Sequence, residues 1–541
     1  MGTQARLART VVYPGVAVAV LAGVLAGCSS TNSGSSSASS GASASTLTLD
    51  VGSYVTTLDP ASACHQIDTG ITNTLYAQLT QYATKPGPDG LLEQDTAKVV
   101  PYLAKSWTVS DGGKTYTFQL RPGMKFPSGD PVDSAAVKFS LLRTVTINGC
   151  GAYGITDGLT NPPQFKAIDT PNPTTVVFHL GQANSDFLQN LAQWSAAIYD
   201  PKVVDANGGV VKNTPNTWMA SHDAGFGPYL IQSYQPNKQL VLTANPNFIT
   251  QPVAKKLVVN FFNSDTSMEL LATSGQADIT VGMSDQGAHS LASNPCCNVA
   301  AFPYPDWDKI ILPNTAYPFT NADFRAALSY AVPYQEILQK VYYGYGQPYY
   351  GIWSPAEPWF NPTTGAPRPF DIAKAKALLK ASGIKTPISF PLLTVEGNSI
   401  ESSIASIVQS TWAELGVKAQ IQTVTPAVQQ QDAYATYKYA VLWNDGPGVV
   451  SPSYQWDYDG ACGSAFNSDQ FCDKAADQLM APLRTTTSTA EQDQITNEVD
   501  QMWIAQSPRI PVMQQDFVVL LNKSVKKFAF YSSARYDLAG F

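Results

Sequence analysis

The sequence has few histidines and no excess of positive charge. It contains 33 Lys and Arg against 41 Asp and Glu, which gives a formal net charge of −8, and its four histidines are scattered. Nucleic-acid phosphates require a basic surface, so this balance argues against a nucleic-acid-binding protein. No Cys-x-x-Cys occurs and the histidines are isolated. The sequence therefore predicts no metal site and no cofactor.

Motifs of common enzyme classes are also missing. Neither Gly-x-Ser-x-Gly nor His-Glu-x-x-His is present. Gly113-Lys114-Thr115 imitates the end of a phosphate-binding loop, but Thr108 stands where that loop needs its first glycine. We therefore expect that the protein is not an enzyme. Turnover of an added substrate would contradict this expectation.

One apolar run is present, at the N-terminus, and no other approaches the roughly 18 residues of a membrane span. Arg6 and Arg9 precede it, and it ends in Leu25-Ala26-Gly27-Cys28. A basic start, an apolar run and small residues before a cysteine are typical of a lipoprotein signal peptide, here 1–27. We expect a lipid on Cys28 and a flexible Ser/Gly-rich tether over 28–45. The alternative is an ordinary signal peptide with an incidental cysteine.

The predicted lipid anchor would hold the protein at the cell membrane, on its extracellular or periplasmic side. Six further cysteines agree with an oxidising compartment, because an even number there suggests disulfides. Cys462 and Cys472 would close a short loop, and Cys64 with Cys150 is a second plausible pair. Cys296 and Cys297 are adjacent, so they would form a vicinal bridge or each pair elsewhere.

Residues 46–541 are too many for one hydrophobic core, so we expect two or three domains. Apolar alternation and helical spacing mix along this part, and helices followed by strands in its later half are typical of an α/β lobe. Asp371 should cap a helix that Gly383 ends, and Pro333 should begin the second of two helices between residues 322 and 343. The predicted strands are 47–51, 106–109, 115–120, 174–180, 239–243, 256–262 and 417–424; the further predicted helices are 69–79, 132–143, 400–415 and 489–506.

A series of short motifs recurs in a fixed order along this part. They are Pro101-Tyr102-Leu103-Ala104-Lys105-Ser106-Trp107, Asp111-Gly112-Gly113-Lys114-Thr115-Tyr116-Thr117-Phe118, Leu120-Arg121-Pro122-Gly123-Met124-Lys125-Phe126, Gly225-Phe226-Gly227-Pro228-Tyr229, Asn245-Pro246-Asn247-Phe248, Phe324-Arg325-Ala326-Ala327-Leu328-Ser329-Tyr330-Ala331, Trp412-Ala413-Glu414-Leu415-Gly416-Val417 and Ser507-Pro508-Arg509-Ile510-Pro511-Val512. Together they resemble the signature of family 5 extracellular solute-binding proteins. That family includes the oligopeptide- and dipeptide-binding proteins of ABC importers.

The resemblance implies an α/β, two-lobed periplasmic-binding-protein-like fold of type II, of the large cluster C type. Lobe I would comprise 46–308 and a C-terminal return over 512–541, with an extra subdomain at about 76–185. Lobe II would comprise 309–511. A monomer would bind a small solute, an oligopeptide or dipeptide first of all, between the lobes by hinge closure. Its partner would be an ABC permease in the membrane.

The resemblance also suggests which residues contact the ligand. Asp445, in Trp443-Asn444-Asp445-Gly446-Pro447, matches the acid that holds a peptide α-ammonium, although one residue fewer separates it from Trp443 than in the family pattern. Asp445 could instead cap a turn, and Trp443 could belong to the core. Tyr439-Ala440 stands where binders of fixed peptide length carry arginine, so selection by length is in doubt. The further candidates are Trp456, Asp457, Tyr458, Gln66 and Asp68.

Other ligands remain open from the sequence alone. The same fold could hold a nickel chelate, haem, a sugar or an antibiotic. It could also serve a surface lipoprotein that senses or scaffolds, because a fold does not fix function.

Overall fold

The computed structural model describes residues 46–156, 164–446, 449–464, 466–486, 488–532 and 538. All of these lie in one compact unit, Ala44–Phe541. The predicted signal peptide 1–27, the lipid-bearing Cys28 and the tether 28–45 fall outside the described residues, as does Pro447. Within the described ranges, every helix is too short or too polar to cross a membrane.

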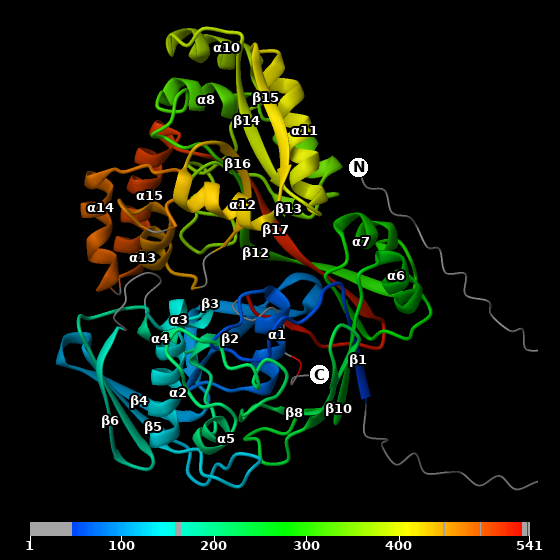
Figure 1. Cartoon of the computed structure of the whole chain (residues 1–541), viewed down its shortest axis with the longest axis vertical. Coiled ribbons are helices and arrows are strands. Elements are labelled where there is room, and N and C mark those ends of the chain that lie inside the picture. The colour runs from blue at the N-terminus through cyan, green and yellow to red at the C-terminus, as the bar shows by residue number, and fades with distance from the viewer. Residues whose placement is uncertain are drawn as a thin grey trace, which may run out of the picture. The chain divides into compact units, whose positions relative to one another are not determined.

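An eleven-stranded mixed sheet runs through the whole unit (Figure 1). Its order is β15-β14-β16-β12-β17-β11-β1-β10-β9-β8, with β13 added beside β17. Its strands are β1 (Thr46–Val51), β8 (Tyr229–Gln235), β9 (Gln239–Ala244), β10 (Lys256–Phe261), β11 (Ile279–Val281), β12 (Cys297–Ile311), β13 (Gly346–Gln347), β14 (Ile388–Val395), β15 (Val417–Val424), β16 (Ala440–Asp445) and β17 (Ile510–Asn522).

Two long antiparallel strands join the halves of this sheet. β12 has 15 residues and β17 has 13, and each packs into two separate hydrophobic cores. Their pairing is interrupted by a bulge, because Pro303 faces Asp516 whereas Trp307 faces Gln514. Three residues of β12, Tyr304 to Asp306, therefore stand opposite one residue of β17. Such a bulge bends the strand and redirects side chains.

Lobe I, as we use the term, is the part packed around the buried cluster that contains Leu49, Phe261, Phe302 and Val519. The parallel strands β1, β10 and β11 form its centre. Helices α1 (Gln66–Leu75) and α5 (Pro201–Ala206) pack into this cluster, and α6 (Asp265–Thr273) and α7 (Asp285–Leu291) form a smaller cluster of their own against β17. Helix α1 was expected over 69–79, but it starts three residues earlier and ends at Leu75, where Tyr76 turns the backbone into an extended conformation.

A separate core accompanies lobe I and contains Phe118, Phe126, Val176 and Phe178. The predicted hairpin is present, with β4 and β5 joined through Gly112 and Gly113 at positive φ. Glycine adopts this conformation without steric cost. The elements around this core are the sheet β4 (Ala104–Ser110), β5 (Thr115–Leu120), β7 (Thr175–Leu180) and β6 (Phe165–Asn172), and helices α2 (Ser134–Ile147), α3 (Cys150–Ile155) and α4 (Phe187–Asn190). A third sheet, β18 (Ala529–Phe530), β3 (Leu92–Pro101) and β2 (Thr80–Pro86), contributes Phe530 to the lobe I cluster.

Lobe II is the part packed around the cluster that contains Trp353, Trp412 and Trp503. The Asp371 side chain accepts a hydrogen bond from Lys374 N, which confirms the predicted cap. Pro333 precedes the second of two short helices, also as predicted. The helices are α8 (Ala322–Tyr330), α9 (Tyr334–Lys340), α10 (Ile372–Ala381), α11 (Ser399–Ala413), α12 (Pro426–Gln431), α13 (Pro452–Gln455), α14 (Lys474–Met480) and α15 (Thr489–Gln506).

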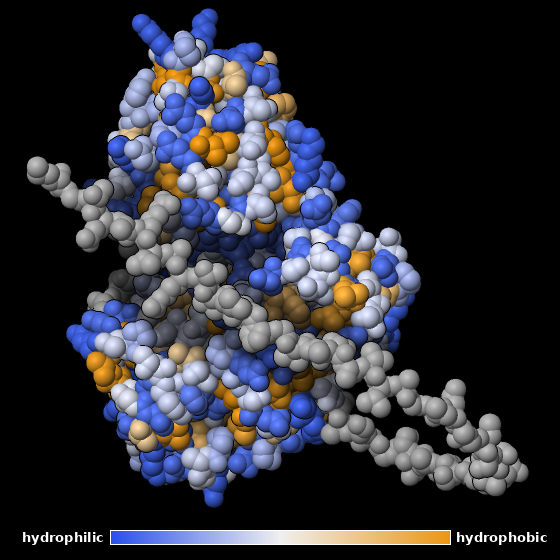
Figure 2. All heavy atoms as spheres, turned by 45° about the vertical axis from the view of Figure 1, so that its right-hand side comes forward, coloured by the Kyte–Doolittle hydropathy of each residue, from blue (hydrophilic) through white to orange (hydrophobic). Residues whose placement is uncertain are grey.

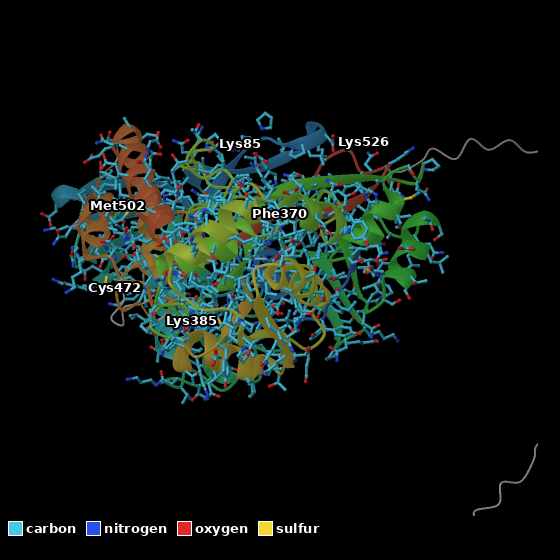
Figure 3. All side chains as sticks on the ribbon, turned by 90° about the horizontal axis from the view of Figure 1, so that it is seen from above. Lys85, Phe370, Lys385, Cys472, Met502 and Lys526 are labelled. Atoms are coloured by element: carbon cyan, nitrogen blue, oxygen red, sulfur yellow. A yellow bond between two sulfur atoms is a disulfide. The ribbon has the colours of Figure 1, made fainter. Side chains whose placement is uncertain are left out.

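The described cysteines form three disulfides, which are the three pairs considered from the sequence. Cys64–Cys150 ties the segment before α1 to α3, across 86 residues of chain. Cys462–Cys472 closes a loop before α14, on the side of the molecule where Figure 3 labels Cys472. Cys296–Cys297 is a vicinal bridge at the start of β12.

Candidate functional site: a cleft between the lobes

Two adjoining cavities follow the bulge of β12. Cavity A has a volume of about 690 Å³ and is lined by residues 51–69 of lobe I, the bulge, and the end of β16. Cavity B has a volume of about 540 Å³ and lies against α7, α9 and α11. The two share Gln66, Gly282, Tyr304 and Phe517 in their walls. Figure 2 shows hydrophilic residues at the recess between the lobes. Concave sites of this size accommodate small organic ligands.

Asp445 ends β16 and lines cavity A. Its carboxylate lies 3.1 Å from Nζ of Lys309, a fully buried residue of β12. Tyr434 Oη and Trp443 Nε1 each donate to Asp445 Oδ2 over 3.2 Å. Its buried Oδ1 atom is the one that lies 3.1 Å from the Lys309 ammonium, and Lys309 Nζ also donates to Oδ2 over 3.2 Å. Burial raises the pKa of Asp445, although the Lys309 charge lowers it.

The Lys309 ammonium is shared with a second carboxylate behind the cavity. Lys309 Nζ lies 3.1 Å from Asp459 Oδ1, and Arg509 donates to both the carboxylate and the carbonyl of Asp459. Burial alone would raise the pKa of Asp459, but the charges of Arg509 and Lys309 outweigh it and lower that pKa. Arg509 Nε also lies 2.7 Å from Asp469.

This buried network therefore contains the carboxylates of Asp445, Asp459 and Asp469 and the cations of Lys309 and Arg509. When all five groups are ionised, the network has a net charge of −1. Asp445 is the member that lines the cavity, whereas Asp459 and Asp469 are buried behind it. A buried charge of this kind is stabilised by an opposite charge within hydrogen-bonding distance. The network thus leaves the cavity-facing side of Asp445 suited to a cationic group.

Asp306 brings a second carboxylate to cavity A. It belongs to the β12 bulge, is 4% exposed, and accepts a hydrogen bond of 3.0 Å from Gln66 Nε2 of α1. A Cβ atom placed on Gly446 would lie 3.1 Å from Asp306 Oδ1 and 2.2 Å from Pro305 O. Glycine at 446 therefore lets the end of β16 approach the bulge, and Asp306 and Asp445 line the same cavity.

Cavity B carries three further carboxylates, those of Asp265, Asp285 and Asp516. Burial, and then the charges of Asp516 and Asp308, raise the pKa of Asp285 to about 7. Asp308 lies buried beside the cavity, where Tyr342 Oη and Gln515 Nε2 donate to it. Burial raises its pKa to about 7 as well. Like charges in a poorly solvated site disfavour one another's ionised form.

The lobes make a second contact away from the cavities. Asp186, 5% exposed and immediately before α4, accepts hydrogen bonds from the hydroxyls of Ser451 and Ser453 at the start of α13. Ser185 N donates to Arg484 O over 2.9 Å, and Ser185 Oγ donates to Leu483 O over 3.2 Å. We call these bonds the Asp186 contact. They hold α4 and α13 together in this structure.

The residues proposed from the sequence fall into two groups. Asp445 and Gln66 line cavity A, and Trp443 hydrogen-bonds Asp445 from the same strand. Trp443 and the four others line neither cavity. Asp68 accepts a hydrogen bond of 2.8 Å from Thr56 N and so supports a wall of cavity A. Trp456 is buried in the lobe II core and donates a hydrogen bond to Asp477. Asp457 forms an ion pair with Arg484, and the ring of Tyr458 stacks on that of Phe466.

The sequence analysis missed Asp306, Lys309, Asp459 and Arg509. The sequence did carry a signal for Asp306 and Lys309, because Asp306-Trp307-Asp308-Lys309 places charged residues directly before an apolar run. Charged residues inside a buried strand require partners, and such partners often mark a site. The partners of Lys309 are 136 and 150 residues away in the chain and the partner of Asp306 is 240 residues away, so local pattern could not identify them.

Comparisons with known proteins agree with this architecture. The model of the bacterial extracellular solute-binding proteins, family 5, matches residues 98–467. The chain is 28% identical to the probable D,D-dipeptide-binding periplasmic protein DdpA of Escherichia coli K12, over 88% of this chain and 89% of that protein. It is 26% identical to the glutathione-binding protein GsiB of Salmonella typhimurium, over 90% and 92%.

Solved structures show the same fold. The DppA protein of Helicobacter pylori in complex with the peptide STSA has a TM-score of 0.75 at 18% identity, covering 91% of this chain and 96% of that one. NikA of Staphylococcus aureus in complex with Ni(L-His)2 has a TM-score of 0.69 at 17% identity, covering 91% and 97%. The expected two-lobed type II binding-protein fold is confirmed. The chain belongs to the bacterial extracellular solute-binding proteins of family 5.

Proposed function

We propose that this protein is the substrate-binding lipoprotein of an ABC importer, and that it captures a small peptide in cavity A and delivers it to the membrane permease. It acts as a monomer, anchored through a lipid on Cys28, and binds its ligand without transforming it. The lobes would comprise 46–308 with 512–541, and 309–511, with an extra subdomain at about 76–185. Relatives that bind a D,D-dipeptide and glutathione support a peptide ligand.

The observation that carries this proposal is the geometry of Asp445. Its carboxylate lines cavity A, and the buried network to which it belongs holds one more carboxylate than cations. A peptide α-ammonium would supply the positive charge that balances this network. In a water-poor cleft, such a charge-assisted hydrogen bond is stronger than one between neutral groups.

Closure of the lobes would complete the site. Gln66 from lobe I already reaches Asp306 on the bulge, and the Asp186 contact joins α4 to α13. A ligand shifts the balance toward the closed state only through contacts that it makes better there. Asp445 on one side of cavity A and residues 51–69 on the other provide such contacts.

The test compares free-amino and N-acetylated forms of one tripeptide. Native mass spectrometry and thermal-shift screening first identify a bound peptide, since a ligand raises apparent stability by mass action. In Asp445→Asn we expect affinity for the free-amino form to fall at least tenfold, while the weak affinity for the N-acetylated form changes little. Asp169→Asn, at an exposed carboxylate in β6, is the matched control.

Equal losses for the two forms in Asp445→Asn would remove the ammonium role of Asp445. Binding of a nickel chelate, haem, a sugar or an antibiotic in place of every peptide would replace the proposed ligand class. Among the described residues, no group of three or more His, Cys, Asp or Glu could hold a metal ion directly. A nickel ligand would therefore have to enter as a chelate.

A further inference from the structure

An aromatic contact joins the two lobes outside the cavities. Tyr153 belongs to α3, beside the core that accompanies lobe I, and Phe466 belongs to the lobe II loop between Cys462 and Cys472. The two rings meet edge to face, with their centroids 5.5 Å apart and their planes at 87°. An aromatic pair in this geometry contributes more than the area that it buries. Any separation of the lobes at this point breaks the contact.

A disulfide supports the segment that carries each ring. The Cys64–Cys150 bridge ties the start of α3 to the segment before α1. The Cys462–Cys472 bridge closes the loop in which Phe466 lies. Fixing a segment in the conformation that makes a contact lowers the entropy cost of forming that contact. Each ring is therefore presented to the other from a segment that is cross-linked within its own lobe.

The same aromatic cluster reaches the carboxylate that lines cavity A. Tyr434 packs edge to face on Phe466, with the ring centroids 5.5 Å apart, and its hydroxyl donates to Asp445 Oδ2 over 3.2 Å. Trp443 packs on Tyr434 with centroids 5.1 Å apart, and its Nε1 donates to the same oxygen. Tyr434 thus contacts Asp445 through its hydroxyl and, through Phe466, is linked to the opposite lobe.

We infer that Tyr153, Phe466 and Tyr434 form a latch that couples closure of the lobes to the positive charge of the ligand. This inference rests on the proposed function, since it takes Asp445 as the anchor of a peptide α-ammonium. Tyr434 is a positioning residue, because its hydroxyl holds Asp445 while Phe466 fixes its ring. Tyr153 fixes Phe466 from lobe I when the lobes meet. Parting of the lobes therefore loosens Asp445, and an ammonium bound to Asp445 favours the ring contact in return.

The test titrates tri-alanine and N-acetyl-tri-alanine into the purified protein by isothermal calorimetry. Tyr153→Leu removes the lobe I ring and changes no residue that lines cavity A or cavity B. We expect the affinity for tri-alanine to fall by about twofold to tenfold, which is the range that an aromatic pair contributes. Because Asp445 is then held less firmly, the ratio of the free-amino to the N-acetylated affinity should fall as well. Phe466→Leu should give the same two results.

Trp107→Leu is the matched control, because it removes a ring contact of similar separation, 6.0 Å to Phe118, beside a single core. It should leave both affinities unchanged. Tyr153 is 42% exposed, so Tyr153→Leu should keep the melting temperature of the ligand-free protein.

The outcomes separate this inference from the proposed function. Equal losses for the two peptides in Tyr153→Leu overturn the coupling to charge, and unchanged affinities overturn the latch itself. Both of these results leave peptide binding intact. Failure of the wild-type protein to bind either peptide contradicts the proposed ligand class, and the inference falls with it.

Discussion

The Asp186 contact offers a direct test of how this protein closes. Asp186→Asn keeps the shape of the side chain but removes the charge that attracts the hydroxyls of Ser451 and Ser453. A hydrogen bond to a charged group contributes about 1.5–3 kcal/mol. The amide oxygen of Asn can still accept one hydrogen bond, and the neutral group costs less to bury. We therefore expect the stabilisation that the Asp186 contact provides to fall by an amount near the lower limit, about 1.5 kcal/mol.

That loss falls on the closed arrangement alone, because the contact joins α4 to α13 across the lobes. A difference of about 1.4 kcal/mol corresponds to a factor of ten in an equilibrium constant. If the closed form is the minor one without ligand, affinity should therefore fall about tenfold. The dissociation rate should rise by most of this factor, since the broken bonds are those that keep the ligand enclosed.

The measurements are calorimetry for the dissociation constant and stopped-flow displacement for the dissociation rate. The double variant Ser451→Ala with Ser453→Ala should show the same loss, and combining it with Asp186→Asn should add little, because both changes remove one interaction. Asp169→Asn again serves as the control. Affinity and dissociation rate within twofold of the wild type in Asp186→Asn would refute the role of this contact in closure.

Two further predictions concern stability. Arg143 and Asp59 form a fully buried ion pair with contacts of 2.8 and 2.7 Å. Arg143→Met should therefore lower the free energy of unfolding by about 3–5 kcal/mol in urea titrations, because it leaves Asp59 buried without its partner. The double variant Arg143→Met with Asp59→Leu should recover much of this loss, and a double variant as unstable as the single one would contradict the prediction. Burial raises the pKa of Asp308 from 3.8 to about 7, so its contribution to stability is fully present below pH 3.8 and is lost as the pH rises through 7. Asp308→Asn should therefore flatten the decline of the melting temperature over that window, and an unchanged decline would show that Asp308 does not cause it.

Much of the fold could be predicted because its signals are local. Helix α15 occupies the expected 489–506, and Asp371 caps α10, because helical spacing and a capping side chain lie within a few residues of each other. Strands β5 and β7 follow their alternating patterns for the same reason. The start of α1 was missed since two of its first three residues, Gln66 and Asp68, are polar, and Asp68 gains its burial only from the surrounding lobe.

The candidate site was only partly predictable. Asp445 and Gln66 reach the cleft, but Trp456 and Asp68 resemble site residues only by sequence position; one fills the lobe II core and the other holds Thr56. Whether these side chains point into the cleft or into a core depends on how segments far apart in the sequence pack together. Lys309 and Arg509 could not be assigned for the same reason, because each is defined by an aspartate that the fold brings from far along the chain.

The bulge in β12 has a mechanical consequence. A paired ribbon bends most easily where its ladder is broken, and the ladder between β12 and β17 is broken at Tyr304 to Asp306. In any rotation about that point, an atom travels in proportion to its distance from the pivot. Asp306 belongs to this break in the ladder, so a rotation of the lobes about the bulge would move it little and would leave it in place to contact a ligand before closure. The Asp186 contact lies away from the two cavities, so a rotation about the bulge would move its partners further apart than it moves Asp306.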